Sequence, residues 1–179
     1  MKFVFACLAA FAGLVYWMLF ASTEAVDTQI AHVALDALPA SAESVPQATA
    51  RFDPEVSSDG AGSVRIDAEG PTFVELAEVE GAGEDLSFRQ LVFQAQVKTE
   101  AMTGPVFLVM QAGIHEVPMP VVGADQQTLT GTQDWTPMEV VAGNPQDTFH
   151  RETTTLQLEV RGAGTVWIDD LRLVNRKHL

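Results

Sequence analysis

The sequence predicts an all-β domain, a sandwich of two antiparallel sheets that follows one N-terminal transmembrane helix. After residue 50, apolar and polar side chains alternate in several short runs, and a period of two is typical of strands with one face on a core. Turns rich in glycine, proline and aspartate separate these runs, and no amphipathic helical pattern follows them. Two sheets packed face to face would bury every apolar face at once.

Residues 1–22 are predicted to form a membrane anchor. The run over residues 3–20 has no charge and no proline, and a helix of this length spans about 27 Å, close to the ~30 Å core of a bilayer. Lys2 precedes the run and acidic residues follow it, which favours an N-terminus in the cytoplasm and an exported remainder. A signal peptide cleaved after Ala25 is the alternative, although its apolar part would be unusually long. Both readings place the domain outside the cytoplasm, and the first makes it a single-pass membrane protein.

Residues 23–50 are rich in Ala, Ser, Thr, Gln and Pro, a composition typical of a linker. We expect a tether here, with a short helix around residues 28–38. The β-sandwich domain is then expected to occupy residues 51–175.

Within that domain, three runs alternate strictly, over residues 63–68, 91–98 and 155–161, and each is predicted to be a half-buried strand. Residues 106–112 begin with apolar side chains on both faces, which indicates an inner strand.

The last strand contains a change of phase. Val166 and Ile168 share one parity, whereas Leu171 and Leu173 have the other. A bulge or sharp twist at Asp169-Asp170 would return all four side chains to the core. Trp167 has the parity of the two leucines, so the sequence also predicts that this ring lies in the core.

Composition excludes several functions. Acidic residues outnumber basic ones by 24 to 10, which argues against a nucleic-acid partner. The single cysteine, Cys7, lies in the apolar run and offers neither an intramolecular disulfide nor an accessible thiol. The four histidines have no metal-ligand spacing, and no nucleophile elbow or phosphate-binding loop is present. The chain is therefore predicted not to be an enzyme.

Three segments carry a resemblance to a known family: FDPEVSSDGAGSVRI, TGTQDWTPMEVV and GAGTVWIDDLRLV. They resemble the galactose-binding-like jelly rolls, a fold used by carbohydrate-binding modules, and are similar to uncharacterised bacterial domains of this type that stand behind a membrane segment. The likeness covers residues 52–174. It implies a structural calcium ion with Asp170 as one ligand and Asp53 or Asp59 on the other side, a role that suits oxygen donors. From the residues alone, the Asp pair could equally cap the bulge through backbone amides.

The resemblance also implies a glycan as partner. A sugar site needs an exposed aromatic ring beside polar groups. Trp135 enters a strand from a polar loop, and Phe149 and His150 lie in another, so these three residues are the predicted ligand-binding set. The alternative is an envelope protein-interaction or scaffold domain with no sugar ligand, which an exposed apolar patch would favour.

Overall fold

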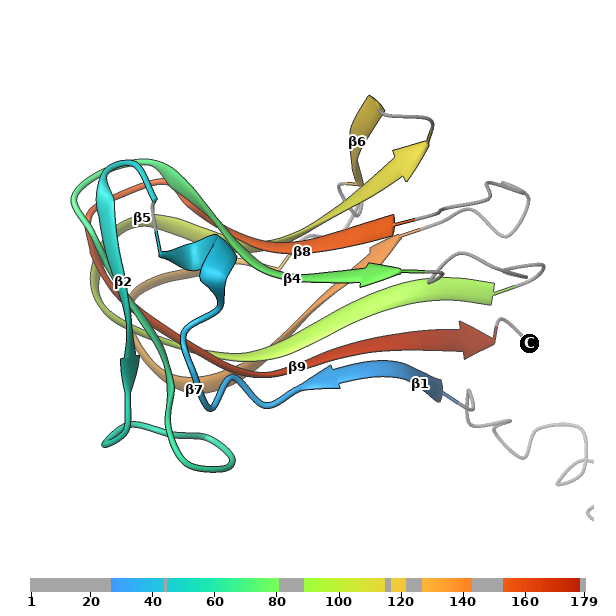
Figure 1. The fold of residues 1–179 in the computed structure, drawn as a ribbon. Coiled ribbons are helices and arrows are strands. Elements are labelled where there is room, and N and C mark those ends of the chain that lie inside the picture. Colours follow the sequence, from blue (N-terminus) through green and yellow to red (C-terminus); the bar gives the residue numbers. More distant parts are fainter. Residues whose placement is uncertain are drawn as a thin grey trace, which may run out of the picture.

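The computed structural model describes residues 27–43, 45–80, 89–114, 117–121, 127–142 and 153–177, which form an all-β domain (Figure 1). The predicted anchor, residues 1–22, lies outside the described residues. Among the residues that are described, no helix has the length and apolar character needed to cross a membrane. The strands are β1 (Asp27–Val33), β2 (Ala48–Asp53), β3 (Ser63–Ala68), β4 (Thr72–Glu80), β5 (Arg89–Ile114), β6 (Val117–Val121), β7 (Leu129–Ala142), β8 (Thr153–Val160) and β9 (Gly164–Lys177), and one 3₁₀ turn, η1 (Ala40–Ala42), precedes β2.

One curled antiparallel sheet replaces the two separate sheets that the sequence predicts, in an arrangement consistent with a β-sandwich. The reason is β5, whose 26 residues run through both layers. Its first half pairs with β9 and β7, and its second half pairs with β8 and β6. We call β1, β2, β3, β7, β9 and the first half of β5 the β9 layer, and β4, β6, β8 and the second half of β5 the β8 layer. Figure 1 shows β4 and β8 lying over β9 and β1.

Apolar side chains of both layers meet in one core. Because strand residues alternate between faces, every second residue of each strand points inward and its neighbours point outward. The strands predicted over residues 63–68, 91–98, 106–112 and 155–161 are confirmed as β3, two parts of β5, and β8. Their inward residues include Val64, Ile66, Phe93, Val97, Val106, Leu108, Leu156 and Leu158, each at most 1% exposed.

The tether predicted over residues 23–50 is wrong at residues 27–33. Residues 27–33, expected to be linker and partly helix, form β1 and pair antiparallel with residues 171–176 of β9. Ala31 and Val33 pack against the core, so β1 belongs to the domain. Composition favoured a linker because the segment is short and weakly apolar, whereas the open edge of β9 supplies the hydrogen bonds that make it a strand.

The predicted bulge in β9 is confirmed. Gln94 pairs with Arg172 and Gln96 pairs with Asp169, so β9 has one residue more than β5 between these pairs. Asp170 takes up the change with a left-handed φ of 51°. Leu171 and Leu173 consequently stay in the core beside Val166 and Ile168.

Asp169 caps this region through backbone amides, as one of the two readings of the Asp pair predicts. Its side chain is fully buried, and Oδ2 accepts hydrogen bonds from the Ser58 amide, the Ser58 hydroxyl and the Asp59 amide at 2.9–3.0 Å. Oδ1 accepts a fourth from the Asp170 amide at 2.8 Å. A buried carboxylate needs such donors, and here they join β9 to the loop between β2 and β3.

We expect Asp169→Ala to lower the free energy of unfolding by about 3 kcal/mol, because three amides lose their acceptor where little water can replace it. Denaturant unfolding monitored by circular dichroism measures this change. Asp134→Ala is the matched control, since Asp134 is 85% exposed and bonds the Lys98 ammonium and the Trp135 amide at the surface, so its loss of stability should stay below about 1 kcal/mol. Equal losses in the two variants would contradict the role given to Asp169.

Candidate functional site

An exposed aromatic ring lies on the outer face of the β8 layer. Phe73 of β4 is 55% exposed, whereas the adjacent Val74 is fully buried. Phe73 pairs across the strands with Glu159 of β8, and Glu159 pairs in turn with Phe107 of β5, so the three residues form one row. The Arg161 guanidinium lies 4.5 Å from the centre of the Phe107 ring and forms an ion pair with Glu159. Phe107 is covered in this way, and Phe73 is not.

The next row along the same strands is polar. Glu75 of β4 pairs with Gln157 of β8, which pairs with Val109 of β5. The Gln157 Oε1 atom accepts no hydrogen bond within the described part of the chain. Side chains in adjacent rows of one face lie within reach of each other, so the Phe73 ring has carboxylate and amide groups beside it. We call Phe73, Glu75, Gln157, Glu159 and Arg161 the Phe73 face.

The sequence contains a signal for this face that our predictions missed. In β4, Val74 and Leu76 point to the core, which leaves Phe73 on the same side as Glu75. A large aromatic side chain on the polar side of an alternating strand is unexpected for a purely structural residue.

The predicted ligand-binding set is only partly described. Trp135 lies half-buried in β7, at a bulge where two residues of β7, Asp134 and Trp135, face the single residue Lys98 of β5. Its amide donates to Asp134 Oδ1 at 2.9 Å. Phe149 and His150 lie outside the described residues, so their role remains a prediction.

Trp167 is buried, as predicted, with 4% of its surface exposed, but it lies on the side of β9 opposite to Val166 and Ile168 and outside the main apolar cluster. The bulge changes the parity of β9, so Trp167 points outward, and Arg65 covers its ring at 5.0 Å. Its Nε1 donates to Asp53 Oδ2 at 3.0 Å. This hydrogen bond is the main reason that the pKa of the Asp53 carboxyl lies below its usual value.

A polar hollow of about 310 Å³ lies on the outer face of the β9 layer. Most of its polar groups already bond one another. Gln94 Nε2 donates to Glu139 at 3.2 Å, the Glu139 amide donates to Gln127, and Arg176 binds Glu139 at 3.1 Å. The hydrogen bond from Arg176 holds the pKa of Glu139 below its usual value. The lining residues are Gln94, Ala95, Gln96, Gln127, Pro137, Met138, Glu139, Asp170 and Arg172.

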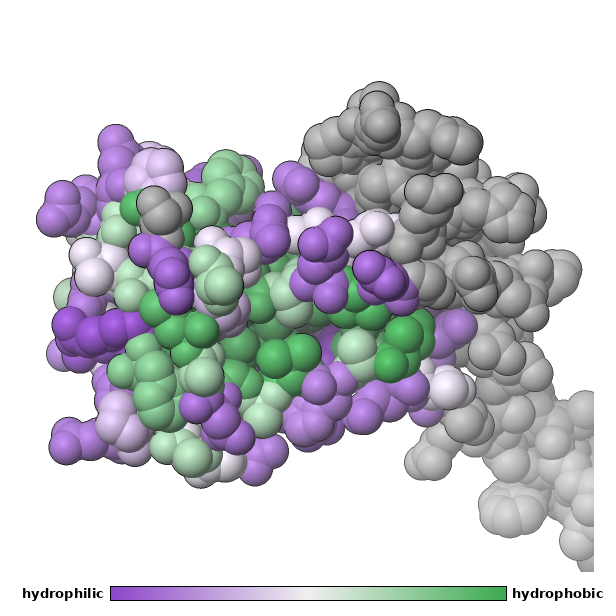
Figure 2. Space-filling model, viewed as in Figure 1, coloured by the Kyte–Doolittle hydropathy of each residue, from purple (hydrophilic) through white to green (hydrophobic). Residues whose placement is uncertain are grey.

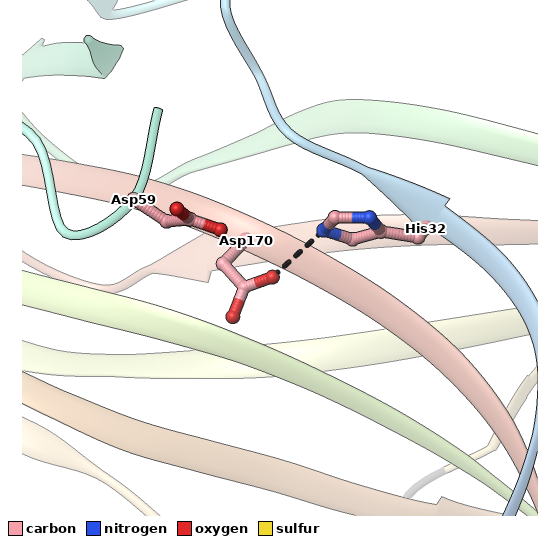
Figure 3. A group of neighbouring side chains, drawn as sticks. All are labelled: His32, Asp59 and Asp170. Atoms are coloured by element: carbon pink, nitrogen blue, oxygen red, sulfur yellow. Dashed lines mark hydrogen bonds and ion pairs between the residues drawn. The ribbon is translucent and has the colours of Figure 1, made fainter. Parts of the chain in front are cut away.

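The predicted calcium ligands are separated into two places. Asp53 bonds Trp167, as described above, and is absent from the group of potential ligands formed by His32, Asp59 and Asp170 (Figure 3). In this group, one donor atom of each residue lies within 4.8 Å of the others. His32 was assigned to the tether, and no local pattern marks it as a ligand. The set offers two carboxylates and one imidazole nitrogen, whereas calcium takes six to eight oxygen ligands. These residues therefore fit calcium poorly, and calcium binding remains a prediction.

An apolar groove of about 520 Å³ lies at the open side of the sandwich, lined by the segment after β1 and by Leu76 of β4. Figure 2 shows apolar side chains gathered between β4 and β1 in this region. The apolar lining residues are Val33, Ala34, Leu35, Ala37, Leu38, Pro39 and Leu76.

The fold is similar to that of solved carbohydrate-binding modules. The CBM22-1 xylan-binding domain of Xyn10C from Paenibacillus barcinonensis matches 88% of this chain over its whole length, with 10% identity and a TM-score of 0.54. A family 30 carbohydrate-binding module matches 83% of the chain over 98% of its own length, with 14% identity and a TM-score of 0.55. The CBM22-1–GH10 modules of Xyn10B from Clostridium thermocellum, solved with xylohexaose, match 86% of the chain over 29% of their length, with 10% identity and a TM-score of 0.54.

No protein-family model matches the sequence, and no curated protein matches it either. At 10–14% identity the structural likeness concerns the fold alone. Within that limit, the resemblance seen in the sequence is confirmed: the domain has the jelly-roll fold of carbohydrate-binding modules.

Proposed function

We propose that this chain is a non-catalytic glycan-binding module, and that the sugar stacks on the Phe73 ring. The single observation that carries the proposal is an aromatic ring, 55% exposed, on the outer face of a sheet with Glu159 in its own row and Glu75 in the next. The likeness to carbohydrate-binding modules supports the same function at the level of fold.

The chemistry of the Phe73 face suits a sugar. The C–H groups on one side of a pyranose ring are apolar and pack against an aromatic ring, while its hydroxyl groups need hydrogen-bond partners at the edge. Glu75 offers acceptors, and Arg161, 55% exposed and paired with the less exposed Glu159, offers its remaining donors. The Gln157 Oε1 atom is buried without a partner among the described residues, and a glycan hydroxyl reaches it only if this side chain turns outward. Because these groups stand on β4 and β8, their spacing is held by the strand register.

Charge selects among glycans. The chain has a formal net charge of −14, and two carboxylates flank Phe73 against one guanidinium. A glycan rich in uronic acids or sulfates would be repelled, so the proposed ligand is a neutral polysaccharide.

The apolar groove between β1 and β4 favours a second function, docking of a protein. Its lining is formed largely by aliphatic side chains and carries few of the polar groups that a sugar requires. An extended apolar segment of an envelope protein would fit such a groove beside β4, which pairs with β8 alone among the described strands.

The test of glycan binding is calorimetry with neutral oligosaccharides, including xylohexaose, and with an oligogalacturonate as the acidic probe. The full chain should be used, because β1 is part of the domain. We expect Phe73→Ala to weaken binding of the neutral ligand by about tenfold to a hundredfold, the cost of losing one stacked ring. Phe73→Trp should retain or strengthen it.

Ile30→Ala is the matched control for that experiment, since Ile30 is the other large apolar side chain that is exposed among the described residues, at 37%, and it lies on β1. The affinity of this variant for the neutral oligosaccharide should equal that of the unchanged chain. Binding that is lost in Trp135→Ala but retained in Phe73→Ala would move the site to Trp135. No heat with any glycan would reject the glycan function and favour the protein-docking reading.

We also propose that residues 3–20 hold the domain at the outer side of a cell membrane. The support is the uncharged apolar run with Lys2 before it. After cell fractionation, the chain should stay in the membrane pellet through an alkaline carbonate wash, and protease added outside the cytoplasmic membrane should digest the domain. Recovery as a soluble protein whose N-terminus follows Ala25 would identify a cleaved signal peptide instead.

A further inference from the structure

We propose that His32, Asp59 and Asp170 form a binding site for a divalent transition-metal ion of the zinc class. The three residues come from β1, from the loop between β2 and β3, and from β9 (Figure 3). His32 Nε2 lies 2.8 Å from Asp170 Oδ1. The ligand atoms of all three residues lie within 4.8 Å of one another. Zinc bonds of about 2.0–2.2 Å place ligand atoms roughly 3–4 Å apart, so a rotation of the exposed Asp59 side chain closes the set.

The fold brings these groups together without the help of an ion. The bulge sends both Asp169 and Asp170 to the outer side of β9. Asp169 then binds the Ser58 and Asp59 amides, which fixes the start of the loop. Asp36 accepts the Ala61 amide at 2.8 Å and fixes its end. Gly60 lies between these two hydrogen-bonded positions and has a φ of 74°, a conformation that favours glycine. Asp59 is held close to Asp170 as a result. A preorganised site loses little conformational entropy when it binds an ion.

The local charges leave a place for a cation. Asp170 is paired with Arg172, whose Nη2 lies 2.8 Å from Oδ2. The Asp59 carboxylate has no ion pair or hydrogen bond with another described residue. Arg172 thus compensates Asp170, and the charge of Asp59 is left without a paired cation. A dication bound to His32 Nε2, Asp59 and Asp170 compensates it, with the imidazole N–H on Nδ1 so that Nε2 offers its lone pair to the ion.

The nitrogen ligand decides the class of ion. Imidazole and carboxylate together suit zinc and its neighbours, which accept four ligands including water. Calcium and magnesium prefer sets made of oxygen alone. Arg172 competes for Asp170, and its side chain is 46% exposed and able to move away. Removing its charge should therefore strengthen metal binding, an effect that a purely structural ion pair does not predict.

Calorimetry of the metal-free full chain with Zn²⁺, and separately with Ca²⁺, tests the proposal. We expect one Zn²⁺ site that millimolar Ca²⁺ does not block. His32→Gln and Asp59→Asn should each weaken it at least about tenfold, because the first removes the imidazole nitrogen and the second removes the negative charge of a carboxylate ligand. Arg172→Gln should strengthen it by about tenfold. The matched control is Asp36→Asn, which keeps an oxygen for the Ala61 amide in the same loop and should bind zinc as the unchanged chain does.

Circular dichroism of each metal-free variant checks that it folds. If His32→Gln does not fold, the zinc affinity of Asp59→Asn tests the proposal, because residue 59 is exposed in a loop. The proposal is overturned if the unchanged chain takes up no zinc, or if zinc binding is the same in Asp59→Asn and Arg172→Gln. It is also overturned if calcium binds as tightly as zinc and His32→Gln has no effect, since the ion would then use oxygen ligands alone.

Discussion

One extra residue in β9 determines much of the outer architecture of this domain. Without the bulge at Asp169-Asp170, strict alternation would place Leu171 and Leu173 on the side opposite Val166 and Ile168. With it, both leucines stay in the core and two consecutive carboxylates point outward. The free-energy cost of burying Asp169 is offset by three backbone amides and one hydroxyl, and the same bonds fix the loop before β3. The neighbouring Asp170 contacts His32 and so joins β1 to the sheet.

The two outer faces of the sandwich differ in whether an aromatic ring is exposed among their polar groups. On the β9 layer, the cations Arg65, Lys98, Arg172 and Arg176 each have a carboxylate partner, and Arg65 covers the Trp167 ring. On the β8 layer, Arg161 is paired with Glu159 and covers Phe107, but Phe73 is uncovered. A ligand that supplies an apolar ring face packs against this ring, which is why the glycan site is assigned to the Phe73 face.

The sequence predicted those parts of the fold that depend on local alternation, and missed those that depend on distant partners. A period of two in the sequence shows which side of a strand is buried. This pattern was sufficient to predict β3, β8 and both parts of β5. β1 could not be predicted in this way, because its strand conformation depends on the edge of β9, 138 residues away at the His32–Asp170 contact. Trp167 is buried as predicted, but on the other side of β9 from the main core, because a bulge changes the parity of the residues on one side of it relative to the other. Asp59 and Asp170 were found through a family resemblance, whereas His32 has no neighbouring motif. Phe73 could have been recognised, since it shares the outward side of β4 with Glu75.

The Phe73 face and the metal cluster are expected to act independently. The first stands on β4 and β8 and the second on β1 and β9, and the packed core of both layers lies between them. Coupling between two such sites requires an element with two alternative arrangements that both ligands bias. In this structure the two sites stand instead on one rigid sheet. β5 continues through both layers, and its pairing with β8 and β9 fixes the register of each layer. A metal ion would hold β1 and the loop more firmly against β9 without moving β4 relative to β8. The affinity for a glycan on the Phe73 face should then be the same with and without zinc.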